Sequence, residues 1–304
     1  FDDMEASLLR TAKRKKIKTF GLANSWDKIT GRCALRVLPD KLIVYNGLVK
    51  QDAIKYVDMS SGSIFVAGVP HYDQHINQVK PNKEDFIKNL GGDPGKKIIF
   101  YAPLAKRFIS SRWSMIDRLQ LLIENGVIEN AQLFVRFQPN DFVEMDEVKK
   151  RKNIIFDIPG IRFSTYMPIG AGIDWDLSSE DIEMLTNGLY HCDVLVSYAS
   201  SLCIDASIFN KPVININFEL STPLSTYRSP TELYKMTHYL NALKTGAIRL
   251  VNNKEEMVVW INKYLENPKL DEDNRKKLLE EQCHVLDGKA GKRTADFIIS
   301  NLNL

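Results

Sequence analysis

From about Lys96 to Ile216, short apolar runs alternate with stretches in which apolar residues recur at helical spacing. The runs are apolar on successive residues, which is typical of a parallel sheet that helices cover on both faces. The pattern therefore predicts a Rossmann-like half. Its strands are expected at Lys97–Pro103, Ala131–Phe137 and Asn153–Ile158, its helices at Ser114–Gly126 and Ser179–Cys192, and a strand, a helix and a strand within Val194–Ile216.

The first 85 residues repeat this alternation in a shorter form. Strands are expected at Ile17–Leu22, Leu42–Asn46 and Ile64–Val69, with a helix at Leu48–Asp58. Three strands make a thin doubly wound domain, so we expect residues 1–85 to be the second part of an N-terminal Rossmann-like domain that begins upstream of Phe1. A polar, turn-rich stretch between Gln78 and Lys97 is the expected hinge.

Beyond Ile216 the pattern changes to helices joined by polar segments, over residues 230–304. Residues 86–285 are expected to form the C-terminal Rossmann-like domain. Residues 286–304 are expected to form a final helix that begins after Asp287, a suitable N-cap residue. In the helix predicted at Ser114–Gly126, Ser114 is the expected cap and Gly126 the expected end.

Composition adds limits rather than a function. The chain has 304 residues, enough for two domains, and a formal charge of +3, too small to indicate nucleic-acid binding. No run approaches the roughly 20 apolar residues of a membrane span. The basic cluster Lys13–Lys18 fits contact with anionic lipid or a phosphorylated acceptor, or simply a solvated helix end. We expect a cytoplasmic protein, with peripheral contact at the inner face of the cell membrane left open.

The four cysteines, Cys33, Cys192, Cys203 and Cys283, are far apart and form no C-x-x-C pair. This spacing argues against a zinc site or a disulfide framework and fits a reducing cytoplasm. No other cluster has the spacing of metal ligands, and no D-x-D occurs. We therefore expect no metal and no bound cofactor.

Candidate chemistry is concentrated in Val194–Ile216, "VLVSYASSLCIDASIFNKPVINI". Ser200 and Ser201 fall where a strand ends and a helix begins, which is where ligands bind in a parallel sheet. Their hydroxyls, the free N–H groups of the first turn and the helix dipole would form a seat for an anion. Asp205, on the same helix, would accept hydrogen bonds from a ribose. The alternative is that the serines only cap the helix and Asp205 favours its positive end.

The order of Asp205, Pro212 and a following apolar strand resembles the donor half of GT-B glycosyltransferases, in which an acid at this position holds the nucleotide ribose. The longer stretch "CDVLVSYASSLCIDASIFNKPVI" resembles the teichoic-acid glycerophosphotransferases and related enzymes of bacterial surface polysaccharide synthesis. Shorter motifs agree in order along nearly the whole chain: "SWDKIT" (25–30), "LPDKLIVYN" (38–46), "AGVPHYD" (67–73), "IFYAP" (99–103), "VRFQPND" (135–141), "THY" (237–239) and "LDGKAGKR" (286–293).

The resemblance implies an α/β, GT-B-like fold of two Rossmann-like halves, with a nucleotide-activated donor on the C-terminal half and the acceptor on the N-terminal half. It also implies that the last helix, anchored by Asp287 and Arg293, crosses back to the first domain. Two positions depart from the family pattern. The relatives resemble R-x-H-P where this chain has residues 136–139, so Gln138 takes the place of the histidine. Tyr198 takes the place in which the relatives tend to have an aspartate. Glutamine can neither transfer protons nor carry charge.

Further candidates are cations at strand ends and groups on the N-terminal side. Arg136, Lys106 and Arg107 would neutralise the donor diphosphate; a surface arginine and a solvated loop are the alternatives. The candidate catalytic residues are Asp27, His71 and His238, with an Asx-turn for Asp27 and a structural role for His238 as the alternatives.

The sequence therefore predicts a transferase that moves a sugar from a nucleotide diphosphate donor to a polysaccharide or lipid-linked acceptor. The first alternative is a transferase of glycerophosphate from a CDP-linked donor. A second is a nucleotide-binding subunit without activity, which Gln138 favours. A nucleotide-sugar epimerase ranks last, because it needs acid–base groups on both faces of the sugar and no convincing pair is present.

Overall fold

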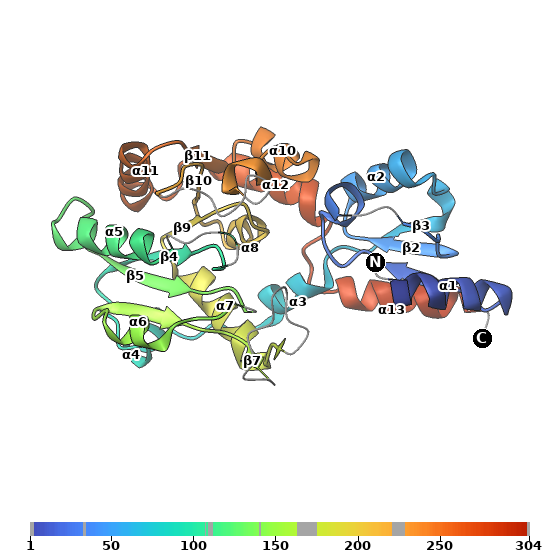
Figure 1. Ribbon diagram of the computed structural model, residues 1–304, viewed down its shortest axis with the longest axis horizontal. Coiled ribbons are helices and arrows are strands. Elements are labelled where there is room, and N and C mark those ends of the chain that lie inside the picture. Colours follow the sequence, from blue (N-terminus) through green and yellow to red (C-terminus); the bar gives the residue numbers. More distant parts are fainter. Residues whose placement is uncertain are drawn as a thin grey trace. The chain divides into compact units, whose positions relative to one another are not determined.

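The computed structural model describes residues 3–32, 35–106, 108, 112–139, 141–162, 175–220 and 229–302 (Figure 1). The chain divides into two compact units. The N-terminal unit contains Phe1–Gln78, Met236–Lys244 and Lys276–Leu304, and the C-terminal unit contains Val79–Lys235 and Thr245–Arg275. The acceptor and donor roles expected for residues 1–85 and 86–285 stay predictions.

The C-terminal unit is built on a six-stranded sheet in the order β11-β10-β9-β4-β5-β6, in which every neighbouring pair is parallel. The strands are β4 (Lys97–Ala102), β5 (Ala131–Arg136), β6 (Ile154–Asp157), β9 (Val194–Ser197), β10 (Val213–Ile216) and β11 (Ile248–Val251). Its helices are α4 (Lys83–Asn89), α5 (Arg112–Glu124), α6 (Met145–Lys149), α7 (Ser179–His191), α8 (Leu202–Ile208), α9 (Pro230–Leu233) and α11 (Lys254–Glu266). Two short strands, β7 (Ile161–Arg162) and β8 (Trp175–Asp176), form a separate antiparallel pair.

Both faces of this sheet are buried, which explains why its strands are apolar on successive residues. On one face Ile99 and Tyr101 of β4 belong to a core that includes side chains of α5 and α11. On the other face Phe100 lies so close to α7 that a Cβ on Gly188 would be 2.8 Å from its ring. The predicted parallel α/β architecture is confirmed.

Two details of the C-terminal unit differ from the expectations. Helix α5 begins at Arg112, ahead of the predicted cap Ser114, and the Arg112 side chain is held by acidic partners described below. Residues 230–304 contain a strand, β11, which the expected series of helices and polar joints did not include. It is a four-residue edge strand interrupted by Arg249, too short and too polar for its pattern to be clear.

The N-terminal unit has a three-stranded parallel sheet, β1-β2-β3. Its elements are α1 (Asp3–Arg14), β1 (Phe20–Leu22), the π-helical turn η1 (Lys28–Arg32), β2 (Lys41–Val44), α2 (Gly47–Val57), the 3₁₀ turn η2 (Ser61–Ser63), β3 (Ile64–Val66), α3 (Pro70–Asn77), α10 (Thr237–Lys244) and α13 (Ala290–Ser300). Helix α12 (Glu272–Cys283) starts in the C-terminal unit and continues into this one.

Figure 1 shows α2 and α13 on opposite sides of β2 and β3. On the α2 side, Leu42 and Val44 are buried with Val49 and Ala53. On the α13 side, the Phe297 ring stacks on that of Phe65 with centroids 4.1 Å apart.

The start of α13 differs from the prediction. Its first two amides, at Ala290 and Gly291, donate to the Asp73 carboxylate at 2.9 and 2.8 Å, so Asp73 and not Asp287 caps the helix. Asp287 instead accepts two hydrogen bonds from Arg293 at 2.7 Å, and Arg293 Nε donates to the Ala67 carbonyl at 2.8 Å. No helix in the described part of the chain is long and apolar enough to cross a membrane.

Candidate functional site

The strand order of the C-terminal unit changes direction between β4 and β9. From β4 the chain builds outward through β5 and β6, whereas β9, β10 and β11 extend the sheet on the other side. In such sheets ligands bind outside the carboxyl ends of the two strands that flank the change. Lys106 follows β4 and Ser200 follows β9, so two predicted donor-binding residues come from loops that leave neighbouring strands.

The beginning of α8 is open to solvent, since Ser201 is exposed and Ser200 is half-buried. Its amides, however, are not free as predicted. Leu202 N–H donates to Ser200 Oγ at 3.3 Å, and the amides of Cys203, Ile204 and Asp205 donate to the carbonyls of Ser200 and Ser201. An anion at this point would therefore interact with hydroxyls and the helix dipole more than with first-turn N–H groups.

The capping alternative holds for one of the two serines. Ser200 Oγ accepts from the first amide of α8, whereas Ser201, the N-cap residue, makes no capping hydrogen bond through its side chain; the anion seat stays a prediction. Asp205 is only 4% exposed. Its contact with a ribose stays a prediction.

Tyr198, one of the two positions expected to depart from the family pattern, is buried directly after β9, and burial raises the pKa of its hydroxyl. It is therefore an uncharged group. Asn215 of β10, which is fully buried, donates to Ser197 Oγ at 3.0 Å and to the Tyr198 carbonyl at 3.1 Å. Sequence reasoning missed Asn215, although a polar residue inside the apolar run "VINI" was the available signal.

Arg136 lies at the carboxyl end of β5, as predicted, but it is not a surface arginine, because it is 5% exposed. Its Nη1 donates to the Asp157 carboxylate of β6, and its Nη2 donates to the Asp181 carbonyl of α7 at 2.8 Å. Burial lowers the pKa of Arg136 and raises that of Asp157, while the ion pair opposes both shifts. The guanidinium thus holds β5, β6 and α7 together, and its contact with a donor stays a prediction.

Lys106 is the predicted cation with an accessible side chain, 49% exposed. Its backbone N–H donates to the Asp141 carboxylate at 3.1 Å, and its ammonium donates to Glu144 at 2.6 Å. Asp141 and Glu144 belong to the loop after β5, so they join this loop to the one after β4. Arg107 lies outside the described residues.

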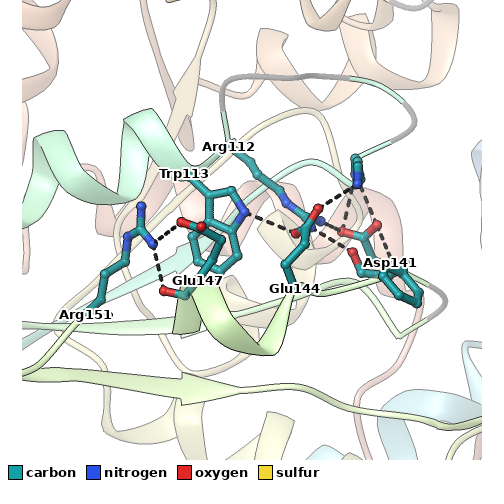
Figure 2. Close-up of polar contacts among 8 residues, drawn as sticks. Arg112, Trp113, Asp141, Glu144, Glu147 and Arg151 are labelled. Atoms are coloured by element: carbon teal, nitrogen blue, oxygen red, sulfur yellow. Dashed lines mark hydrogen bonds and ion pairs between the residues drawn. The ribbon is translucent and has the colours of Figure 1, made fainter. Parts of the chain in front are cut away.

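Figure 2 shows the buried centre of this junction, Arg112. Its guanidinium, 2% exposed, donates to the carboxylates of Asp141 and Glu144 and to the Phe142 carbonyl at 2.7 Å. Trp113 Nε1 donates to Glu144 at 3.2 Å. Partial burial raises the pKa of Glu144, but hydrogen bonds from Lys106 and Arg112 outweigh it and lower the pKa to about 2.

None of Arg112, Asp141 and Glu144 was singled out from the sequence as a functional candidate. The acids in "QPNDFVE" were the available signal, but their partners are about 30 residues away in the sequence. The exposed Gln138 lies in the same loop, and its carbonyl accepts from Asp141 N–H at 2.9 Å.

In the N-terminal unit, two of the three predicted catalytic residues lie beside one glycine. A Cβ built on Gly31 would be 3.3 Å from His238 Cε1 and 3.5 Å from the Asp27 Cβ. The Trp26 ring packs edge-on against His238, with centroids 5.0 Å apart. Asp27 also accepts a hydrogen bond from Ser25 Oγ, and its carbonyl accepts from Gly31 N–H at 2.7 Å. Neither of these hydrogen bonds is that of an Asx-turn, in which the side chain accepts from the backbone N–H two residues further on, so this alternative for Asp27 stays a prediction.

The third predicted catalytic residue, His71, is exposed in the first turn of α3. Its ring centroid is 5.3 Å from that of His75, which is buried on the same helix. Catalytic roles for Asp27, His71 and His238 stay predictions.

Comparison with known structures gives the fold. The chain is similar to a variant of the wall teichoic acid polymerase TagF soaked with CDPG (TM-score 0.55, 16% identity), covering 86% of this chain and 58% of that one. It is also similar to S. aureus MnaA in a structure with UDP (TM-score 0.58, 15% identity, 97% and 71% covered). A third match is the UDP-GlcNAc 2-epimerase of Methanocaldococcus jannaschii (TM-score 0.57, 15% identity, 96% and 73% covered).

These similarities confirm a GT-B-like fold, and the chain spans less than three fifths of the TagF variant. No curated protein sequence gives a significant match. The sequence profile of the family described as CDP-glycerol:poly(glycerophosphate) glycerophosphotransferase matches residues 16–300. Since that match covers almost the whole sequence, the chain belongs to the CDP-glycerol:poly(glycerophosphate) glycerophosphotransferase family.

Proposed function

We propose that this protein transfers a group from a nucleotide diphosphate-linked donor to a growing cell-surface polymer of the teichoic-acid type, with CDP-glycerol as the first candidate donor. The observation that carries the proposal is that the loops after β4 and β9 leave neighbouring parallel strands at the change in strand order. One supplies the accessible ammonium of Lys106 and the other the hydroxyls of Ser200 and Ser201. Family membership supports the choice of donor.

With CDP-glycerol, an acceptor hydroxyl would attack the phosphorus that carries glycerol. A new oxygen–phosphorus bond forms, the bond from that phosphorus to the bridging oxygen breaks, and CMP leaves with the electron pair. The hydroxyl proton passes to a base, for which Asp27, His71 and His238 are the candidates. Lys106 and the positive end of α8 would offset the charge that develops on the departing CMP.

The second candidate donor is a nucleotide diphosphate sugar. Gln138 and Tyr198 favour it, because neither supplies the titratable group expected for glycerophosphate transfer. In that reaction the bond between the sugar carbon and the diphosphate oxygen breaks and the nucleoside diphosphate leaves. We propose that either transfer proceeds without a divalent ion.

For the acceptor we propose a polysaccharide or a lipid-linked polymer at the cytoplasmic face of the membrane. Lys13, Arg14, Lys15 and Lys16 are all exposed at the end of α1 and beyond it, which supports peripheral contact with an anionic surface.

Calorimetry and thermal-shift measurements with CDP-glycerol and with UDP-, GDP- and dTDP-sugars test the donor. We expect one of them to bind and to raise the melting temperature, followed by turnover when an acceptor polymer is added. If CDP-glycerol binds and no sugar nucleotide does, the first donor is supported. If a sugar nucleotide binds and CDP-glycerol does not, the second is supported. If the full-length protein binds a donor but shows neither turnover nor donor hydrolysis, the non-catalytic subunit is supported. If it binds none of these nucleotides, the proposal is refuted.

A further inference from the structure

Lys106 is held at two points by two different acids. Its backbone N–H donates to Asp141 at 3.1 Å, which fixes the course of the loop after β4. Its ammonium donates to Glu144 Oε1 at 2.6 Å, although the side chain is 49% exposed. The group that the proposed function assigns to the donor phosphate is therefore already neutralised by a carboxylate of this chain.

Glu144 does not depend on Lys106 for its own position. Its second oxygen, Oε2, accepts hydrogen bonds from Arg112 Nη2 and from Trp113 Nε1, the latter at 3.2 Å (Figure 2). These donors belong to the first two residues of α5. If the lysine ammonium turned to another anion, Glu144 would stay in place beside it, still ionised.

Arg112 does not depend on Glu144 alone either. Its Nη1 is paired with Asp141, and Nη2 also donates to the Phe142 carbonyl at 2.7 Å. Neutralising Glu144 therefore leaves the buried guanidinium with a carboxylate and a carbonyl. The side-chain amide introduced by Glu144→Gln would retain an oxygen to accept from Trp113, so the junction can survive this substitution.

We propose that Glu144 competes with the donor phosphate for the Lys106 ammonium and so lowers the affinity for donor, whereas Asp141 positions Lys106 and raises it. The inference rests on the proposed function, because it takes Lys106 to be a phosphate-binding group. A phosphate that approaches Lys106 must share the ammonium with Glu144 or displace it, and it meets the repulsion of the carboxylate in either case. The two acids of one loop thus act with opposite signs.

The test is calorimetric titration of CDP-glycerol and of UDP-GlcNAc into the wild type and the variants Glu144→Gln and Asp141→Asn. We expect up to about fivefold tighter binding by Glu144→Gln, because the Lys106 ammonium then no longer has to leave an ion pair, and an ion pair between accessible groups corresponds to roughly that change in affinity at most. We expect at least about fivefold weaker binding by Asp141→Asn. Glu147→Gln is the matched control, because Glu147 lies three residues after Glu144 but pairs with Lys150 and Arg151 instead of Lys106. This variant should change the affinity less than about twofold.

Two further measurements separate competition from a merely structural role. In a Lys106→Gln background, Glu144→Gln should lose most of its gain in affinity. Amide hydrogen exchange at Lys106 should quicken in Asp141→Asn and change little in Glu144→Gln, since Asp141 and not Glu144 accepts that N–H.

Equal or weaker donor binding by Glu144→Gln, with the wild type still binding, overturns the inference alone. A full gain in affinity that persists without the lysine also overturns it, since the carboxylate would then act only through long-range charge. Failure of the wild type to bind either nucleotide overturns the proposed function and this inference with it.

Discussion

Replacing Asp157 by alanine is expected to destabilise the C-terminal unit by about 3–5 kcal/mol. The reason is the burial of its partner, since Arg136 is 5% exposed and, among the described residues, would keep one hydrogen bond, to the Asp181 carbonyl at 2.8 Å, and the weaker attraction of the Asp181 charge. Burial lowers the pKa of Arg136, which means that its charged form is already disfavoured there. A guanidinium cannot lose its proton at neutral pH, so the unpaired charge stays in the interior. At roughly 2–4 °C per kcal/mol, the melting temperature should fall by about 6–20 °C.

The change in unfolding free energy is measured by urea denaturation, with tryptophan fluorescence as the signal. The matched control is Asp117→Ala, which removes an aspartate from another arginine, Arg151. Because the Asp117 side chain is 53% exposed, its loss should cost no more than about 1 kcal/mol. Replacing the buried pair together, by Arg136→Met with Asp157→Leu, should recover most of the stability. A loss for Asp157→Ala no larger than that for Asp117→Ala would refute the reasoning.

Three other predictions concern charge and donor binding. The pKa of Glu144 is about 2 in the folded protein, against an ordinary 4.5, so its ion pairs contribute stability that is fully present above about pH 4.5 and is lost as the pH falls toward 2. Glu144→Gln should therefore flatten the pH dependence of the unfolding free energy in that range. An unchanged slope would contradict the ion pairs. Asp205→Asn should weaken nucleotide binding about tenfold or more in calorimetry, because hydrogen bonds to a charged acceptor are lost, and unchanged affinity would remove the ribose contact. Excess EDTA should leave turnover within about twofold, since Lys106 and the dipole of α8 are proposed to balance the leaving group; loss of activity that magnesium restores would contradict this.

Much of the C-terminal sheet could be predicted because its inner strands β4, β5, β9 and β10 are buried on both faces, so their pattern needs no knowledge of neighbouring strands. β4, β5 and β9 all begin where the apolar runs begin. β11 escaped because an edge strand with Arg249 in its middle has neither a continuous apolar run nor a clear alternation. The polar partners escaped for another reason. Asp157 and Asp181 meet Arg136 only after the sheet forms, and nothing in local spacing marks them as its partners.

The candidate donor site shows the same division. Ser200, Ser201 and Asp205 could be chosen from one short stretch, since a strand end, a helix start and their side chains are contiguous in the sequence. That Lys106 leaves the neighbouring strand could not be predicted, because it depends on the order β9-β4, which places next to each other two strands far apart in the chain. The hydrogen bonds of the α8 amides within their own turn could not be predicted from the hydrophobic pattern either, because they depend on backbone geometry.

The loop after β5 contains both Gln138, one of the two expected departures from the family pattern, and the acids that hold Lys106. Gln138 is not titratable, while Asp141 and Glu144, three and six residues later, hold the backbone and the ammonium of Lys106. Proton transfer and cation positioning make different demands, because the first needs a pKa near neutrality and the second needs a permanent charge at a fixed place. With a pKa of about 2, Glu144 meets the second demand and not the first, and Asp141, whose pKa burial raises, is occupied by Arg112 and by the Lys106 N–H. For the proposed transferase we therefore look for the proton acceptor outside this loop, and the residues of the N-terminal unit beside Gly31 are where mutagenesis should begin.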